Sequence, residues 1–148
     1  MNKNINKTKL NRDLHFGLKS EELVIQKLQI RFGDLIKLDK YNNFDFKGDK
    51  IYIELKTRRI NHNKYPSLMF SKRKLDKGLE LYTDEGAEIL FLFMCLDGLY
   101  GWYYINDDEI SDNYEIKTGG RKDRGIVELE DMVHIKTRDL FKFEIAYQ

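Results

Sequence analysis

The chain has 148 residues, of which 41% are hydrophobic, 34% charged and 13% aromatic, and its formal net charge is +1. This length fits one domain with a single core, and the longest apolar run, residues 89–96, is too short to span a bilayer. The polar, basic start of the chain has no apolar signal region, and Cys95 is the only cysteine, which excludes an intrachain disulfide and a thiolate zinc cluster. We therefore expect a soluble, cytoplasmic protein without membrane contact.

The charges are unevenly distributed along the chain. Residues 56–77 carry eight Lys or Arg residues and one acid, Asp76, whereas residues 107–115 carry five acids and no base. The basic stretch could present a positive face to phosphates, although solvated charges on an ordinary surface would look the same in sequence.

The first elements follow from periodicity. Apolar residues at helical spacing predict a helix over residues 14–32, with Gly33 as its end. Residues 34–38 form a short strand candidate. Residues 44–56 alternate with period two around Gly48-Asp49, which predicts a β-hairpin with a type II′ turn.

Residues 57–70 read as basic and irregular, with a short apolar patch at its end. Ser71 predicts the N-cap of a helix over residues 72–83. A strand buried on both faces is expected at residues 89–96, and an aromatic strand at residues 100–105. A second hairpin is expected around residues 115–129, then a strand at 132–135 and a helical turn near Asp139.

The first hairpin carries the chemistry. A two-residue turn at Gly48-Asp49 would pair Asp45 with Tyr52 and place Glu54 diagonally across the strands. Alternation would put Asp45, Tyr52, Glu54 and Lys56 on one face, and the apolar residues Phe44, Phe46, Ile51, Ile53 and Leu55 on the other.

Two carboxylates and a lysine on a shared face suit phosphodiester hydrolysis. A hard cation such as Mg²⁺ binds carboxylate and phosphate oxygens, and it can activate a bound water. A neighbouring lysine can stabilise the developing charge or orient the water. A salt-bridged surface hairpin is the alternative for the Glu-x-Lys pair alone. The aspartate, the apolar opposite face and the basic stretch that follows favour a site.

These residues, Asp45 with Glu54-Leu55-Lys56 and the following Thr57-Arg58-Arg59, resemble the PD-(D/E)xK nuclease superfamily. The stretch IYIELKTRR is similar to the catalytic strand of archaeal Holliday junction resolvases and related small nucleases. The proline of the motif is absent, because Phe44 precedes Asp45. The resemblance covers residues 14–96. It implies that Asp45 and Glu54 bind Mg²⁺, or Mn²⁺ in its place, and that Lys56 acts beside the scissile phosphate.

The resemblance also implies supporting residues. Many members carry an acid on the first helix four residues after a glycine, which indicates a catalytic role for Glu21, with Glu22 as the alternative. A glutamate favoured there by the helix dipole is the structural explanation. Related families place a Gln or Lys on the helix after the catalytic strand, which indicates Lys74 as a base beside the site. The expected nucleic-acid contacts are Arg58, Arg59, Lys72, Arg73, Lys74, Arg121 and Arg124.

Residues 100–148 take no role from the resemblance and are expected to form a β-rich extension of the core at residues 14–96, within a single nuclease domain. Loop 118–125 has three basic residues among three glycines. This loop either binds the sugar–phosphate backbone or is a mobile hairpin tip. The aromatic residues at 100–104 either stack on unpaired bases or, as strand alternation favours, pack in the core and form a partner surface.

The expected fold is α/β and restriction-endonuclease-like, with a central mixed sheet flanked by helices and an extra C-terminal β-hairpin region. The first functional hypothesis is a Mg²⁺-dependent endonuclease acting on duplex or branched DNA, of repair, recombination or restriction type. It needs no small-molecule cofactor, and a homodimer would supply two active sites. The alternatives are a nucleic-acid-binding module that does not cleave and a protein-interaction domain that uses its aromatic strands.

Overall fold

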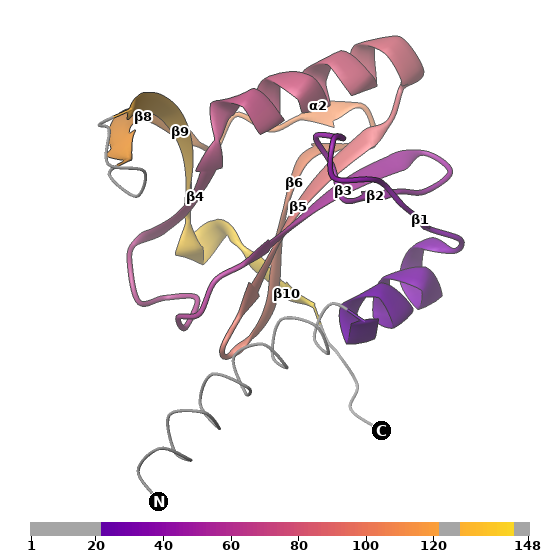
Figure 1. Ribbon diagram of the computed structural model, residues 1–148, viewed down its shortest axis with the longest axis horizontal. Coiled ribbons are helices and arrows are strands. Elements are labelled where there is room, and N and C mark those ends of the chain that lie inside the picture. Colours follow the sequence, from indigo (N-terminus) through magenta and orange to yellow (C-terminus); the bar gives the residue numbers. More distant parts are fainter. Residues whose placement is uncertain (1–21, 122–127, 144–148) are drawn as a thin grey trace, which may run out of the picture. The chain divides into compact units, whose positions relative to one another are not determined.

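The computed structural model (Figure 1) describes residues 22–121 and 128–143. The chain divides into two compact units, Met1–Leu35 and Ile36–Gln148. Among the described residues, no helix is long and apolar enough to cross a membrane.

In the first unit, residues 22–32 are helical, and Val24 and Leu28 on this helix are buried. The helix ends where predicted, at Gly33. The φ of Gly33 is 78°, and its N–H donates to the Gln29 carbonyl, which closes the last turn. The predicted beginning of the helix lies outside the described residues.

The second unit is built on a mixed sheet with strand order β1-β2-β3-β5-β6-β10, in which β7 also pairs with β6. The β3–β5 pair is parallel, and the other pairs of this sheet are antiparallel. The strands are β1 (Ile36–Lys37), β2 (Phe46–Lys47), β3 (Ile51–Thr57), β5 (Glu88–Cys95), β6 (Gly98–Asn106), β7 (Glu109–Ile110) and β10 (Phe141–Phe143).

A smaller antiparallel sheet has the order β4-β9-β8. Its strands are β4 (Ser67–Ser71), β8 (Glu115–Arg121) and β9 (Glu128–Lys136), and the short 3₁₀ helix η1 (Thr137–Asp139) follows β9. The helix α2 (Lys72–Glu85) continues directly from β4, as Figure 1 shows. Its predicted N-cap is confirmed, because the Ser71 side chain accepts a hydrogen bond from the Arg73 N–H, and Gly86 ends the helix with a φ of 70°.

The main core of this unit lies between one face of the large sheet and the layer formed by the small sheet and α2. The large sheet contributes Phe91, Phe93 and Trp102, and β4 contributes Phe70. The Phe70 ring stacks on the Phe91 ring with centroids 4.1 Å apart. The predicted strand at residues 89–96 is confirmed as β5, since Ile89 to Cys95 are all buried.

Two predictions about elements were wrong in part. Residues 67–71, read as the end of an irregular segment, form β4, whose pairing partner β9 lies more than sixty residues later in the chain. The predicted strand at 132–135 is the second half of β9, which continues from the predicted hairpin with β8. The β4–β9 pairing has no local sequence signature, because its strands are distant in the sequence.

The predicted register of the first hairpin was also wrong. Phe46 pairs with Ile53 and Lys47 with Tyr52, so the connection is longer than the Gly48-Asp49 turn. Gly48 is absent from the described residues with positive φ, which a type II′ turn requires at this position. The observed register sets the buried side chains of Phe46 and Ile53 opposite each other, and this burial outweighs the local turn preference.

The predicted separation of an apolar and a polar face was only partly correct. Phe44 and Tyr52 were expected on different faces of the hairpin. Instead, the Phe44 ring packs on the Tyr52 ring, with centroids 5.9 Å apart, and on the Phe91 ring at 5.8 Å. The face of β3 that carries Tyr52 and Glu54 is therefore also a core face. Among the described residues, Glu54 is a charged side chain that is buried, with 4% exposure.

Candidate active site

Asp45 lies directly before β2 and is tied to β3 by two hydrogen bonds. Its backbone N–H donates to the Ile53 carbonyl at 3.0 Å. Its carboxylate oxygen Oδ2 accepts from the Leu55 N–H at 2.8 Å. These bonds hold the Asp45 carboxylate beside the part of β3 that carries Glu54.

Glu54 lies in the middle of β3, and its parallel register partner on β5 is Phe91. Its Oε2 atom is buried and accepts no hydrogen bond within the described chain. A buried carboxylate oxygen without a hydrogen bond is destabilising. Such an atom points to a ligand that the protein alone does not provide.

Two lysines approach this carboxylate from different elements. Lys56 Nζ, from β3, lies 3.5 Å from Glu54 Oε1, and Lys74 Nζ, from α2, lies 3.1 Å from Glu54 Oε2. Lys74 thus forms an ion pair with Glu54 Oε2, and its ammonium also donates to the Asn43 carbonyl. The structure therefore gathers Asp45, Glu54, Lys56 and Lys74 at one place.

Burial is the main influence on the charge of Glu54. The pKa of Glu54 is raised to about 7, first by desolvation and then by the neighbouring Asp45 carboxylate, while Lys56 and Lys74 oppose the rise. A carboxylate that titrates near neutrality next to a second carboxylate is typical of functional sites.

The helix α2 is fixed at both ends, and this sets the position of Lys74. At its start, Ser71 Oγ donates to Glu130 Oε1 on β9 at 2.5 Å. At its end, the Tyr52 hydroxyl donates to the two carboxylate oxygens of Glu85 at 3.0 and 2.9 Å. Tyr52 is two residues before Glu54, so the strand that carries the carboxylate also holds the helix that carries the lysine.

Comparison with known proteins gives one match. A family model described as "Phage putative PDDEXK endonuclease" matches residues 19–143. The chain belongs to this PDDEXK endonuclease family. No match was found among curated proteins or among solved structures.

Membership in the PDDEXK family confirms the predicted superfamily and the restriction-endonuclease-like α/β fold, and it supports nuclease activity on a nucleic acid. Nucleases of this superfamily typically use divalent metals. The matched range includes the C-terminal strands, which the sequence resemblance did not cover. The more specific likeness to archaeal junction resolvases has no support from these comparisons.

The donor set of this PDDEXK site suits a hard divalent cation. Asp45 and Glu54 supply two carboxylates, and a cation would satisfy the buried Oε2 atom. Within residues 22–121 and 128–143, no cluster of three or more Asp, Glu, His or Cys side chains could hold a metal ion. Water, phosphate or backbone oxygens would therefore complete the coordination, as is usual for Mg²⁺.

The predicted nucleic-acid contacts have different environments. Arg58 donates to the Thr57 and Met69 carbonyls at 3.1 and 2.9 Å, so part of its guanidinium already holds the backbone. Lys72 pairs with Asp76 at 2.9 Å. The Arg73 side chain is 82% exposed and lies 3.4 Å from Glu130. Arg59 is exposed. Glu21, Arg124 and the side chain of Arg121 lie outside the described residues.

Two features of the site had no signal in the sequence. Lys74 donates to the carbonyl of Asn43, which is a backbone group that every residue carries, so no residue type in the sequence predicts this contact. The Tyr52–Glu85 contact joins residues 33 positions apart. Both depend on the packing of α2 against the hairpin, which only the folded chain shows.

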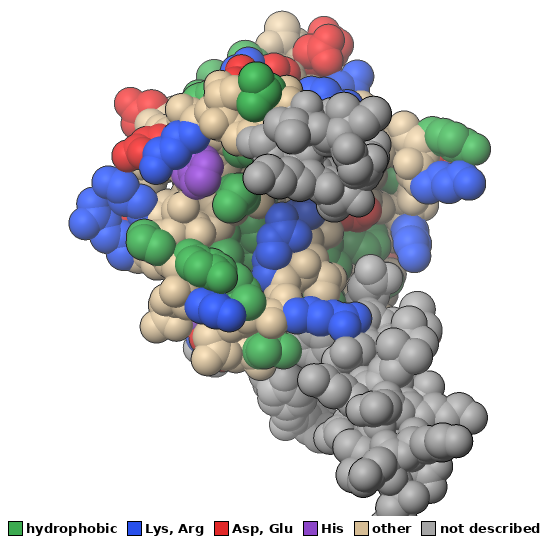
Figure 2. Space-filling model, turned by 60° about the vertical axis from the view of Figure 1, so that its left-hand side comes forward, with side chains coloured by type: hydrophobic (Ala, Val, Ile, Leu, Met, Phe, Trp, Pro, Cys, Tyr) green, Lys and Arg blue, Asp and Glu red, His purple; other side chains and the backbone are tan. Residues whose placement is uncertain are grey.

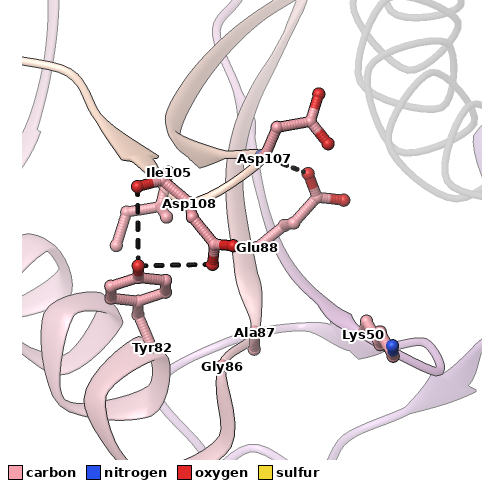
Figure 3. Close-up of a pocket in the computed structure, with 8 residues that line it drawn as sticks. All are labelled: Lys50, Tyr82, Gly86, Ala87, Glu88, Ile105, Asp107 and Asp108. Atoms are coloured by element: carbon pink, nitrogen blue, oxygen red, sulfur yellow. Dashed lines mark hydrogen bonds between the residues drawn. The ribbon is translucent and has the colours of Figure 1, made fainter.

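A pocket of about 350 Å³ lies elsewhere, at the C-terminal end of α2. Figure 3 shows its lining, in which the Tyr82 hydroxyl donates to the backbone and side chain of Asp108, and Glu88 accepts from the Asp107 N–H. None of the predicted site residues lines it. The carboxylate–lysine cluster is therefore distinct from this acidic pocket.

Proposed function

We propose that this chain is a Mg²⁺-dependent endonuclease that hydrolyses phosphodiester bonds of DNA, with Mn²⁺ able to replace Mg²⁺. The observation that carries the proposal is Glu54, a carboxylate with 4% exposure and one oxygen without a hydrogen bond. It lies beside a second carboxylate and two lysines. A purely structural glutamate would gain nothing from being buried next to Asp45.

Each residue of the cluster has a role that follows from its position. Asp45 and Glu54 would hold the cation. When bound, the cation supplies positive charge to the phosphate and lowers the pKa of a coordinated water. The Lys56 ammonium, beside Glu54 Oε1, is placed to donate to phosphate oxygens as their negative charge grows. Lys74 favours the ionised form of Glu54, which is the form a cation binds.

We also propose that the basic segment after β3 and the start of α2 guide the DNA backbone, through Arg58, Arg59, Lys72, Arg73 and Lys74. Figure 2 shows Lys and Arg side chains spread over one described face, while Asp and Glu side chains gather mainly near its upper rim.

The test is cleavage of duplex, branched and single-stranded DNA with Mg²⁺ or Mn²⁺ by the wild type and by Asp45→Asn, Glu54→Gln and Lys56→Met. We expect each variant to lose about 100-fold or more of the activity, in the range for acid–base and charge-stabilising groups. Asp49→Asn is the matched control, since Asp49 is an exposed carboxylate in the same hairpin. It should retain full activity.

Full activity of Asp45→Asn or Glu54→Gln would overturn the site assignment. Titration with Mn²⁺ followed by calorimetry separates the alternative function, because a module that binds DNA without cutting predicts no metal affinity at this cluster. Branched or duplex substrates cut in both strands would require two copies of the site. Sedimentation of the DNA complex would show whether a homodimer supplies them.

A further inference from the structure

Tyr41 is the most exposed large hydrophobic side chain of the described chain, at 84%. Of the aromatic residues first considered for base stacking, Tyr100, Trp102 and Tyr104 are only 7, 3 and 5% exposed, and their rings fill the core. Tyr103 is partly buried, and its ring stacks on the Phe141 ring with centroids 5.6 Å apart. Tyr41 has no comparable packing role, which leaves its exposure to be explained.

The loop that carries Tyr41 has a defined shape. Asp39 Oδ1 accepts hydrogen bonds from the Tyr41 N–H and from the Asn42 side-chain amide, both at 2.9 Å. The Asn42 N–H donates to the Asp39 carbonyl at 3.1 Å. Such Asx turns fix the backbone locally. The loop therefore presents the tyrosine from an ordered turn.

This loop is also part of the candidate active site. It runs between β1 and Asp45, and its Asn43 carbonyl accepts from Lys74, whose ammonium lies 3.1 Å from Glu54. Two residues of chain span at most about 7 Å, so the Tyr41 backbone is close to that carbonyl. Tyr41 therefore lies on the loop that borders the candidate active site.

We propose that Tyr41 stacks on an unpaired nucleobase beside the phosphate held at Asp45 and Glu54, so that the protein prefers DNA with unpaired nucleotides at this position. This inference rests on the proposed function for the identity of the ligand. In a duplex, neighbouring bases cover both faces of each base, so an added ring gains little. An unpaired base offers its face to the tyrosine whatever its sequence.

Lys40 adds to this arrangement. Its ammonium lies 5.2 Å from the centroid of the Tyr41 ring. The pair presents a flat π surface together with a positive charge, which suits a base and its own phosphate. Loss of the ring should therefore weaken stacking and leave the attraction to phosphates in place.

The experiment measures binding, with Ca²⁺ in place of Mg²⁺ so that a cation is present at the carboxylates, of a gapped DNA and a fully paired DNA of the same sequence, with 2-aminopurine at the gap as the fluorescent base. We expect Tyr41→Leu to weaken binding of the gapped DNA by about tenfold, within the range for one stacked base, and to abolish quenching of 2-aminopurine. Binding of the duplex should change less than about twofold. Tyr41→Phe, which keeps the ring, should behave like the wild type.

Tyr65 provides the matched control, because it is 55% exposed and also has a lysine, Lys64, 5.6 Å from its ring centroid. Tyr65→Leu should keep the wild-type preference for the gapped DNA. The stacking role is overturned if Tyr41→Leu weakens both DNAs equally, if Tyr65→Leu reproduces its effect, or if the wild type binds neither DNA. A wild type that prefers gapped DNA without cutting it would contradict the proposed function alone.

Discussion

At the scale of single residues, Glu54 shows how a candidate active-site residue can lower the stability of the folded protein. Its carboxylate is buried among core residues beside Asp45, and its pKa is raised to about 7. Because the folded chain holds the Glu54 proton more tightly than the unfolded chain, the stabilisation is complete below the unfolded pKa of about 4.5 and is lost as the pH rises through 7. Above pH 7 the folded protein therefore carries an unfavourable charge.

Glu54→Gln should consequently stabilise the metal-free protein at pH 8, because glutamine is neutral at every pH. The gain is about 3 kcal/mol, from 1.36 kcal/mol per pKa unit, and it should shrink as the pH falls toward 5. Urea unfolding at several pH values in EDTA measures it. Glu80→Gln, at an exposed position on α2, is the control and should change stability little. A destabilised Glu54→Gln at pH 8 would contradict the assigned burial effect.

At the scale of elements, α2 is the part that completes the cluster, and Gly78 sets how closely it approaches the sheet. A Cβ atom added at Gly78 would lie 2.9 Å from Cγ2 of Ile89 on β5 and 3.5 Å from the Phe44 ring. Ile89 is fully buried and has no room to move. The helix therefore depends on a residue that is a poor helix former.

Gly78→Ala should lower the free energy of unfolding by about 1 kcal/mol. The gain in helix propensity is about 1 kcal/mol, and overpacking of a full core costs about 1–3 kcal/mol. Urea unfolding measures the balance, with Glu80→Ala as a control for propensity at an exposed site of the same helix. A Gly78→Ala protein more stable than the wild type would show that α2 can move away without penalty.

The elements also show where sequence reasoning succeeds. The helix α2 was predictable because Ser71 and Gly86 are strong local capping signals, and β5 because its apolar run is continuous. The hairpin register was not, since burial of Phe46 against Ile53 overrides the turn preference of Gly48. The strand β4 was missed because β9, its partner, is distant in sequence. Asp45, Glu54 and Lys56 were predicted from alternation and motif. The structure brings them together although the hairpin register differs by two residues from the predicted one.

At the scale of the second unit, the two sheets are joined through Phe70. Its ring, 1% exposed, stacks on Phe91 and lies 6.3 Å from Phe93 and 6.2 Å from Trp102. The small sheet is thus anchored on the large one by aromatic packing. The hydrogen-bond ladders of the two sheets are separate. We therefore expect this aromatic packing to be a main reason why the two sheets unfold together.

Phe70→Ala should lower the free energy of unfolding by about 3–5 kcal/mol, the usual cost of removing a buried phenylalanine. Trp102 is the only tryptophan, so its fluorescence reports on this interface. In the wild type, fluorescence and far-ultraviolet circular dichroism should give the same urea midpoint. Separate midpoints in the wild type would indicate that the small sheet unfolds independently.

The Leu55 N–H donates a hydrogen bond to Oδ2 of the Asp45 carboxylate. A main-chain group of β3 therefore fixes one of the two carboxylates that would hold a cation, and this carboxylate does not depend on its side-chain rotamer alone. The backbone of the strand that carries Glu54 thus helps to set the distance between the two acids.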